Sequence, residues 1–90
     1  MKTLSDFKKR LSPGVKLATE HAKFGQLGVR EVSRVQTNAF TLLTDKNGEM
    51  VESWCYFPKT SEFEVLDKDT ALIYWGSGNG RELILTYKFV

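Results

Sequence analysis

The amino-acid sequence predicts a mainly β fold, a small antiparallel barrel with one N-terminal helix and an added C-terminal β-hairpin. Three observations predict it. Before a turn at residues 12–14, apolar side chains recur with helical spacing. After that turn, apolar and polar residues alternate with a period of two, which is typical of strands with one buried face. About seven short apolar segments are joined by turns of hairpin length, which favours antiparallel neighbours.

The size and composition indicate one folded domain. The chain has 90 residues, of which 41% are hydrophobic and 27% are charged. These values are close to those of soluble globular proteins and exclude intrinsic disorder. Within the single domain of residues 1–90, we expect an N-terminal helical segment (1–13), a barrel (14–66) and a C-terminal hairpin (67–90).

A short helix is predicted between Leu4 and Leu11. These two leucines and Phe7 recur at helical spacing and form one apolar stripe. Thr3 and Asp6 have the spacing of a capping box at its start. A helix this short is marginal on its own, so its apolar stripe must dock onto the rest of the chain.

Strands are predicted from residue 15 onward. Residues 15–20 alternate as a first strand, and glycines bracket a predicted loop over 22–28. In residues 29–37, valine recurs at every third position, which breaks strict alternation. A strand with a β-bulge explains this spacing, and a helical turn is the competing interpretation.

The remaining segments alternate between strands and tight turns. Asn47-Gly48 is a strong hairpin signal, because this pair tolerates the positive φ that such turns need. Pro58 ends a strand, since proline cannot donate a hydrogen bond to its neighbour. The predicted elements are strand 40–44, turn 45–48, strand 50–57, a 3₁₀ turn over 58–62, strand 63–66, turn 67–69, and a last hairpin of 70–75 and 82–89 around 76–80.

The order of elements over residues 14–66 resembles a small SH3-like barrel. The resemblance is carried by Gly14-Val15, the glycines at 25 and 28, Asn47-Gly48, Trp54, and the Phe57-Pro58 stop before a single turn and a brief strand. The segment 53–65 also resembles small uncharacterised proteins of bacteria and their phages.

The resemblance implies a fold rather than a ligand, because SH3-like barrels serve many unrelated functions. The chain adds a hairpin over residues 70–90. It also lacks the acidic, tyrosine-rich first loop and the paired tryptophans of the members that bind proline-rich peptides. Binding of that kind is therefore not expected.

The charge distribution points to a binding module. The net charge is only +2, but residues 1–34 carry eight basic and three acidic side chains (+5), and residues 35–90 carry five and eight (−3). We expect a small non-enzymatic module that binds nucleic acid or an acidic protein through a basic N-terminal face, with affinity that falls steeply with salt. An ordinary surface with mixed charges is the competing interpretation. The expected binding residues are Lys8, Lys9, Arg10, Lys23, Arg30, Arg34, Trp54 and Tyr56.

Trp54 and Tyr56 point to one face of their predicted strand, and Cys55 and Phe57 point to the other. Both faces cannot line one barrel interior. Packing of Trp54 and Tyr56 under the helix or the last hairpin is the favoured interpretation. Otherwise both rings are exposed and can stack on a base or anchor a partner.

The residues capable of catalysis are few. His21 is the only histidine and Cys55 the only cysteine, so neither a disulfide within the chain nor a Cys/His metal cluster can form. The two could pair only from neighbouring strands. The acidic residues at 62–69 are expected to be solvated at a turn, and the glycine-rich loop at 76–80 has no following helix to hold a phosphate. We expect no enzyme activity, no cofactor and no metal.

The C-terminal strand suggests the alternative function, a module for protein–protein interaction or homodimerisation that does not bind nucleic acid. Its centre, residues 83–85, is apolar on both faces, so the strand is either covered on both sides or pairs with a second copy in a homodimer. No signal peptide or membrane-spanning stretch is visible, and one unpaired cysteine fits a reducing cytoplasm.

Overall fold

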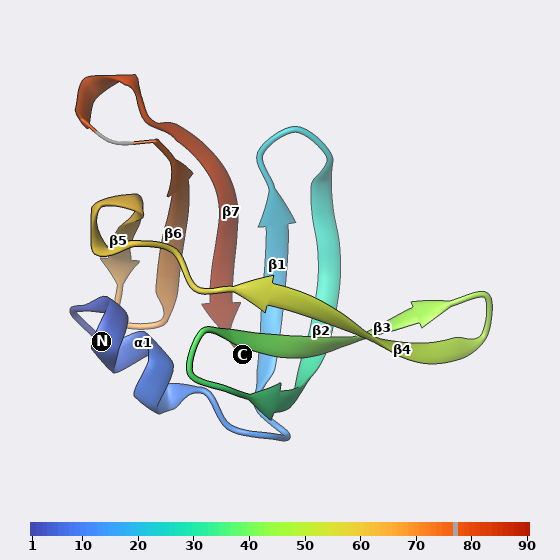
Figure 1. Ribbon diagram of the computed structural model, residues 1–90. Coiled ribbons are helices and arrows are strands. Elements are labelled where there is room, and N and C mark those ends of the chain that lie inside the picture. Colours follow the sequence, from blue (N-terminus) through green and yellow to red (C-terminus); the bar gives the residue numbers. More distant parts are fainter. Residues whose placement is uncertain (77) are drawn as a thin grey trace.

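The computed structural model describes residues 1–76 and 78–90, and in these residues it contains seven strands and one α-helix (Figure 1). The mainly β class and the N-terminal helix are therefore confirmed. Ser77, in the predicted loop over 76–80, lies outside the described residues. The elements are α1 (Leu4–Arg10), β1 (Lys16–His21), β2 (Gly25–Val35), β3 (Ala39–Lys46), β4 (Glu49–Tyr56), a 3₁₀ turn η1 (Thr60–Glu62), β5 (Phe63–Asp67), β6 (Thr70–Trp75), a 3₁₀ turn η2 (Gly78–Gly80) and β7 (Glu82–Phe89).

The strands form one antiparallel sheet in the order β4-β3-β2-β1-β7-β6-β5. Strand β7 lies between β1 and β6, so the C-terminal hairpin is part of the sheet and joins β5 to the first strand. The two edge strands, β4 and β5, are not paired with each other. The sheet therefore curls, with β4 crossing in front of β1 and β7 in Figure 1, but it does not close into the expected barrel.

Strand β2 bends the sheet. Its first part pairs with β1, its last part pairs with β3, and the register to β3 shifts between Val32 and Arg34. This confirms the predicted bulge. The loop predicted over 22–28 is wrong, because β2 already begins at Gly25. Gly25 and Gly28 take positive φ values of 78° and 83° within the strand, where the register to β1 shifts as well.

Helix α1 fills the concave side of the curled sheet. The capping box forms as predicted: Thr3 Oγ1 accepts from the Asp6 amide at 3.1 Å, and Asp6 Oδ2 accepts from the Thr3 amide at 3.1 Å. Phe7 has no exposed surface, and its ring centre lies 5.6–6.5 Å from five other aromatic rings. These rings belong to Phe40 of β3, Phe57 after β4, Phe63 of β5, and Tyr87 and Phe89 of β7.

We expect Phe7→Ala to lower the free energy of unfolding by about 3–5 kcal/mol, because it removes the ring that all these strands share. That is a large part of the total for a domain of this size. Urea denaturation followed by circular dichroism measures it. Phe24→Ala, at an exposed ring in the β1–β2 turn, is the matched control with little expected effect. Equal unfolding midpoints for the two variants would contradict the role given to Phe7.

The cap also predicts a dependence of stability on pH. Hydrogen bonds from the backbone amides of Lys2 and Thr3 hold the pKa of Asp6 below its ordinary value of 3.8. The lower pKa in the folded state means that Asp6 stabilises the protein above about pH 4 and that this contribution is lost as the pH falls. Thermal unfolding should show Asp6→Asn less stable than the parent at pH 7, with the gap narrowing by pH 3. Glu49→Gln, at the exposed β3–β4 turn, is the control, and an unchanged gap would refute the prediction.

Candidate functional site

The basic residues expected to form one face are dispersed over the structure. Lys8, Lys9 and Arg10 belong to α1, whereas Lys23 lies in the β1–β2 turn at the opposite end of the molecule (Figure 1). Arg30 and Arg34 lie on β2, and Arg30 faces the concave side. No single patch collects all six cations.

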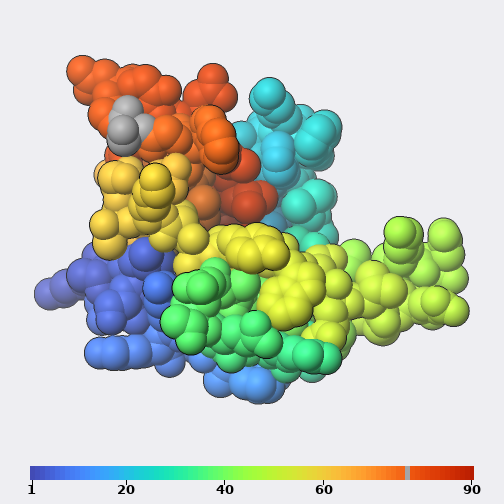
Figure 2. All heavy atoms as spheres, viewed as in Figure 1, coloured from blue at the N-terminus to red at the C-terminus, as the bar shows by residue number. Residues whose placement is uncertain are grey.

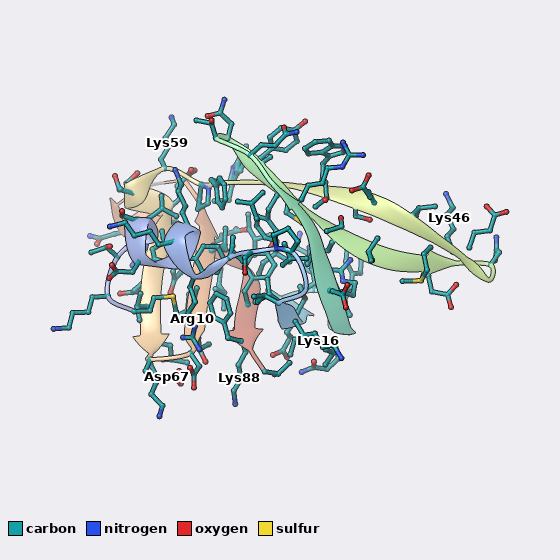
Figure 3. All side chains as sticks on the ribbon, turned by 90° about the horizontal axis from the view of Figure 1, so that it is seen from below. Arg10, Lys16, Lys46, Lys59, Asp67 and Lys88 are labelled. Carbon is teal, nitrogen blue, oxygen red and sulfur yellow. The ribbon has the colours of Figure 1, made fainter. Side chains whose placement is uncertain are left out.

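Arg10 is held by contacts within the protein. Its guanidinium donates to the Lys68 carbonyl and to Asp69 Oδ1, both at 2.7 Å, and lies 4.2 Å from the ring centre of Phe89. These contacts fasten the end of α1 to the β5–β6 turn. Figure 3 shows Arg10 on the same side of the molecule as Asp67, so charges of both signs are mixed there.

Trp54 and Tyr56 are exposed, so the expectation that they pack in the core is wrong. Trp54 keeps 48% of its surface accessible and Tyr56 keeps 76%. Cys55 pairs with buried Phe40 and shares its face, which turns both neighbouring rings to the opposite side of the sheet. The helix packs on the face of Phe40, through the ring of Phe7. The face of Trp54 and Tyr56 is therefore left uncovered.

The two rings border a surface hollow of about 640 Å³ at the β2–β3 turn. A hydrogen bond from the Gln36 amide to the Ala39 carbonyl closes this turn, and the Phe57 amide donates to the Asn38 carbonyl, which joins the turn to the end of β4. In Figure 2, the yellow segment that contains Trp54 and Tyr56 lies on the surface beside the green segment of the turn. We call this surface the aromatic face; its residues are Gln36, Thr37, Asn38, Ala39, Trp54 and Tyr56.

A polar network borders the aromatic face on β2 and β3. Glu52 Oε2 accepts hydrogen bonds from Ser33 Oγ at 2.9 Å and Thr41 Oγ1 at 3.2 Å, and it pairs with Arg34 Nε at 2.9 Å. The hydrogen bond from Ser33, followed by those from Thr41 and the charge of Arg34, lowers the pKa of Glu52. The ion pair orients Arg34, whose side chain remains 59% exposed.

Lys8 lies on the other side of this segment. Its Nζ is 4.8 Å from the ring centre of Phe57, and that ring packs against Phe7 and Phe40 on the concave side. Among the six expected cations, Arg34 adjoins the exposed rings, because its partner Thr41 pairs with Trp54.

His21 and Cys55 have separate partners. His21 Nδ1 accepts from the Lys23 amide at 3.0 Å, and its ring lies 4.6 Å from that of Phe24, so it orders the β1–β2 turn. Burial raises the pKa of the Cys55 thiol, which donates to the Ser53 carbonyl at 3.8 Å. A protonated thiol and a histidine held in a turn do not form a nucleophile with its base.

The acidic cluster of the sequence is divided among local contacts. Glu64 accepts from Tyr74 Oη at 3.0 Å and from Arg81 at 3.2 Å, whereas Asp69 pairs with Arg10. Within residues 1–76 and 78–90, no group of three His, Cys, Asp or Glu side chains is arranged to hold a metal ion. The Glu62 carboxylate accepts hydrogen bonds from the Lys59 and Gly76 amides, and the Asp67 carboxylate accepts one from the Asp69 amide.

Strand β7, the strand expected to mediate a homodimer, is paired along both edges with β1 and β6. A second copy could reach it only through its faces, where Leu83 is partly exposed. The free edges of the sheet belong to β4 and β5. Among the described residues, no helix is long and apolar enough to span a membrane.

The sequence predicted Trp54, Tyr56 and Arg34 as binding residues but not the turn residues 36–38 that complete the aromatic face. Gln36 and Thr37 fall at the end of the strand predicted over 29–37, and no signal in the sequence indicates that this segment lies beside β4. No model of a known protein family matches the chain, and searches of curated proteins and of solved structures find no match either.

Proposed function

We propose that the protein is a small non-enzymatic module that binds single-stranded nucleic acid on its aromatic face. The observation that carries the proposal is the exposure of Trp54 and Tyr56 side by side on one face of β4. Exposed aromatic rings of this kind cost free energy in water unless a partner covers them. Stacking of one base on an aromatic ring contributes about 1–3 kcal/mol and tolerates any sequence.

The groups around the rings suit a nucleotide. The side-chain amides of Gln36 and Asn38 and the hydroxyl of Thr37 offer donors and acceptors for base edges. Arg34, at one end of the face, can contact a phosphate. An acidic protein partner would need a denser group of cations than this one.

We also propose that residues 14–66 are a divergent SH3-like barrel. The support is the order of elements: four strands in a meander, a single 3₁₀ turn and a short fifth strand. The departure is that β6 and β7 lie between this fifth strand and β1. The compartment that we propose is the reducing cytoplasm, in which the lone Cys55 remains a thiol.

A protein partner is the second candidate, and the free edge of β4 favours it. An eight-residue edge strand offers unpaired backbone groups to which an extended segment of another protein, or of a second copy, can add as a further strand. Sedimentation at high concentration distinguishes the two candidates: a monomer that binds oligonucleotide supports nucleic-acid binding, whereas a dimer that does not bind supports the alternative.

Trp54→Ala should weaken the binding of a thymidine oligonucleotide about 5–150-fold, which corresponds to the loss of one stacked base. Trp75→Ala is the matched control, because Trp75 is an exposed tryptophan on β6, away from the aromatic face. Fluorescence anisotropy of a labelled oligonucleotide measures both affinities. Equal losses for the two variants, or none, would contradict the proposed site.

The salt dependence should be shallow, in contrast to the steep dependence expected from the sequence. One adjoining cation predicts a slope of log K against log salt of about −0.7, the value for a single phosphate contact on a single strand. If all six cations took part, the slope would be about −4. Titrations between about 50 and 200 mM salt distinguish these slopes. The steeper slope would contradict the proposed site and indicate that the other basic residues also contact phosphates.

A further inference from the structure

A second polar cluster lies on the concave face of the sheet, opposite the aromatic face. Arg30 pairs across the sheet with fully buried Leu17, so its side chain points to the core side. Thr19, two residues along from Leu17, pairs with Tyr87 of β7 on the same side. The register thus places one cation among buried core residues.

Arg30 is only partly satisfied in this position. Its Nη1 donates to Thr44 Oγ1 at 3.1 Å, and Thr44 Oγ1 lies 3.0 Å from Ser53 Oγ. Its Nε atom is buried without a hydrogen-bond partner. In the part of the chain that the structure describes, no carboxylate lies within ion-pair distance of Arg30. Arg30 is half-buried, and a cation that is partly withdrawn from water favours an anionic partner.

Two titratable groups near Arg30, Tyr87 and Cys55, are neutral. Burial raises the pKa of each, so both remain protonated. Neither group can therefore supply the negative charge that Arg30 lacks.

Thr19 provides an independent sign of a missing ligand. Its side chain is 1% exposed, and its Oγ1 is buried without a hydrogen-bond partner. Buried hydroxyls are nearly always hydrogen-bonded in folded proteins. Thr19 and Arg30 lie on the adjacent strands β1 and β2 and face the same side of the sheet. Gly28, which pairs with Thr19, precedes Arg30 by two residues.

Gly28 leaves this region open. It pairs directly with Thr19, it is exposed, and a Cβ atom built at this position would meet no other atom within 4 Å. Its positive φ of 83° disfavours a side chain there. Gly28 therefore leaves open space beside its partner Thr19.

We propose that Arg30 and Thr19 form a binding site for a small oxyanion, with a phosphate group as the ligand. The planar guanidinium matches phosphate oxygens in a forked arrangement, and the threonine hydroxyl donates one further hydrogen bond. The site is separate from the aromatic face, since Ser53 and Cys55 alternate with Trp54 along β4. A free phosphate and the phosphate of a bound nucleic-acid strand share the chemistry that the site recognises.

Nuclear magnetic resonance titration of the full chain with inorganic phosphate tests the site. We expect saturable shifts of the Arg30 side-chain Nε–H and of the Thr19 and Gly28 amides. Arg30→Met should abolish them, and Thr19→Val, which keeps the shape and removes the hydroxyl, should lower the affinity about 3–10-fold. Lys16→Met, at an exposed cation of β1, the strand of Thr19, should leave the affinity unchanged.

Three results would overturn the proposal: shifts at Arg30 that never saturate, equal effects of Arg30→Met and Lys16→Met, or a Thr19→Val variant that binds phosphate as the parent does. If Arg30→Met fails to fold, Arg30→Lys, which keeps the charge and loses the fork, carries the test with an expected loss of at least about 10-fold.

A second arm of the titration identifies the source of the phosphate. A thymidine oligonucleotide of about eight residues that shifts the Arg30 Nε–H, and that binds more weakly to Arg30→Met, assigns the site to the nucleic-acid strand. Shifts with inorganic phosphate alone assign it to a free anion. Trp54→Ala should leave the affinity for inorganic phosphate unchanged, so failure of the aromatic face and failure of this site are distinguishable.

Discussion

The burial of Phe7 is the interaction on which the rest of the structure depends. A seven-residue helix has little stability of its own, and a seven-stranded sheet with two free edges has no closure to hold its curl. The ring of Phe7 meets rings from β3, β5, β7 and the segment after β4, and it thereby joins both ends of the sheet to one point. The curl, the concave side and the position of β4 follow from this contact.

Because α1 occupies the concave side, the two faces of β4 have different roles. Cys55 and Ser53 face inward, toward Tyr87 and the polar cluster of Arg30. Trp54 and Tyr56 face outward and are exposed. The period of two in a single strand thus separates an aromatic binding face from a small inner site, and each can be tested without disturbing the other.

The local structure could be predicted from the sequence, and the long-range arrangement could not. The capping box, the β2 bulge and the Asn47-Gly48 turn have short-range causes, and all three are present. The burial of one face of β4 was expected, but which face is covered depends on where Phe7 docks, far away in the chain. The central place of β7 and the inward direction of Arg30 depend on which strands pair and in what register. A single sequence specifies both only weakly. For the same reason, the cations of the N-terminal segment are close in sequence and apart in space.

We propose above all that the uncovered face of β4 binds the bases of a nucleic-acid strand. Intermolecular nuclear Overhauser effects between an isotopically labelled protein and a saturating thymidine oligonucleotide test it most directly. We expect contacts from the base protons to the Trp54 indole and the Tyr56 ring, and none to the Trp75 indole. Saturable binding with base contacts to Trp75 and none to Trp54 or Tyr56 would contradict it.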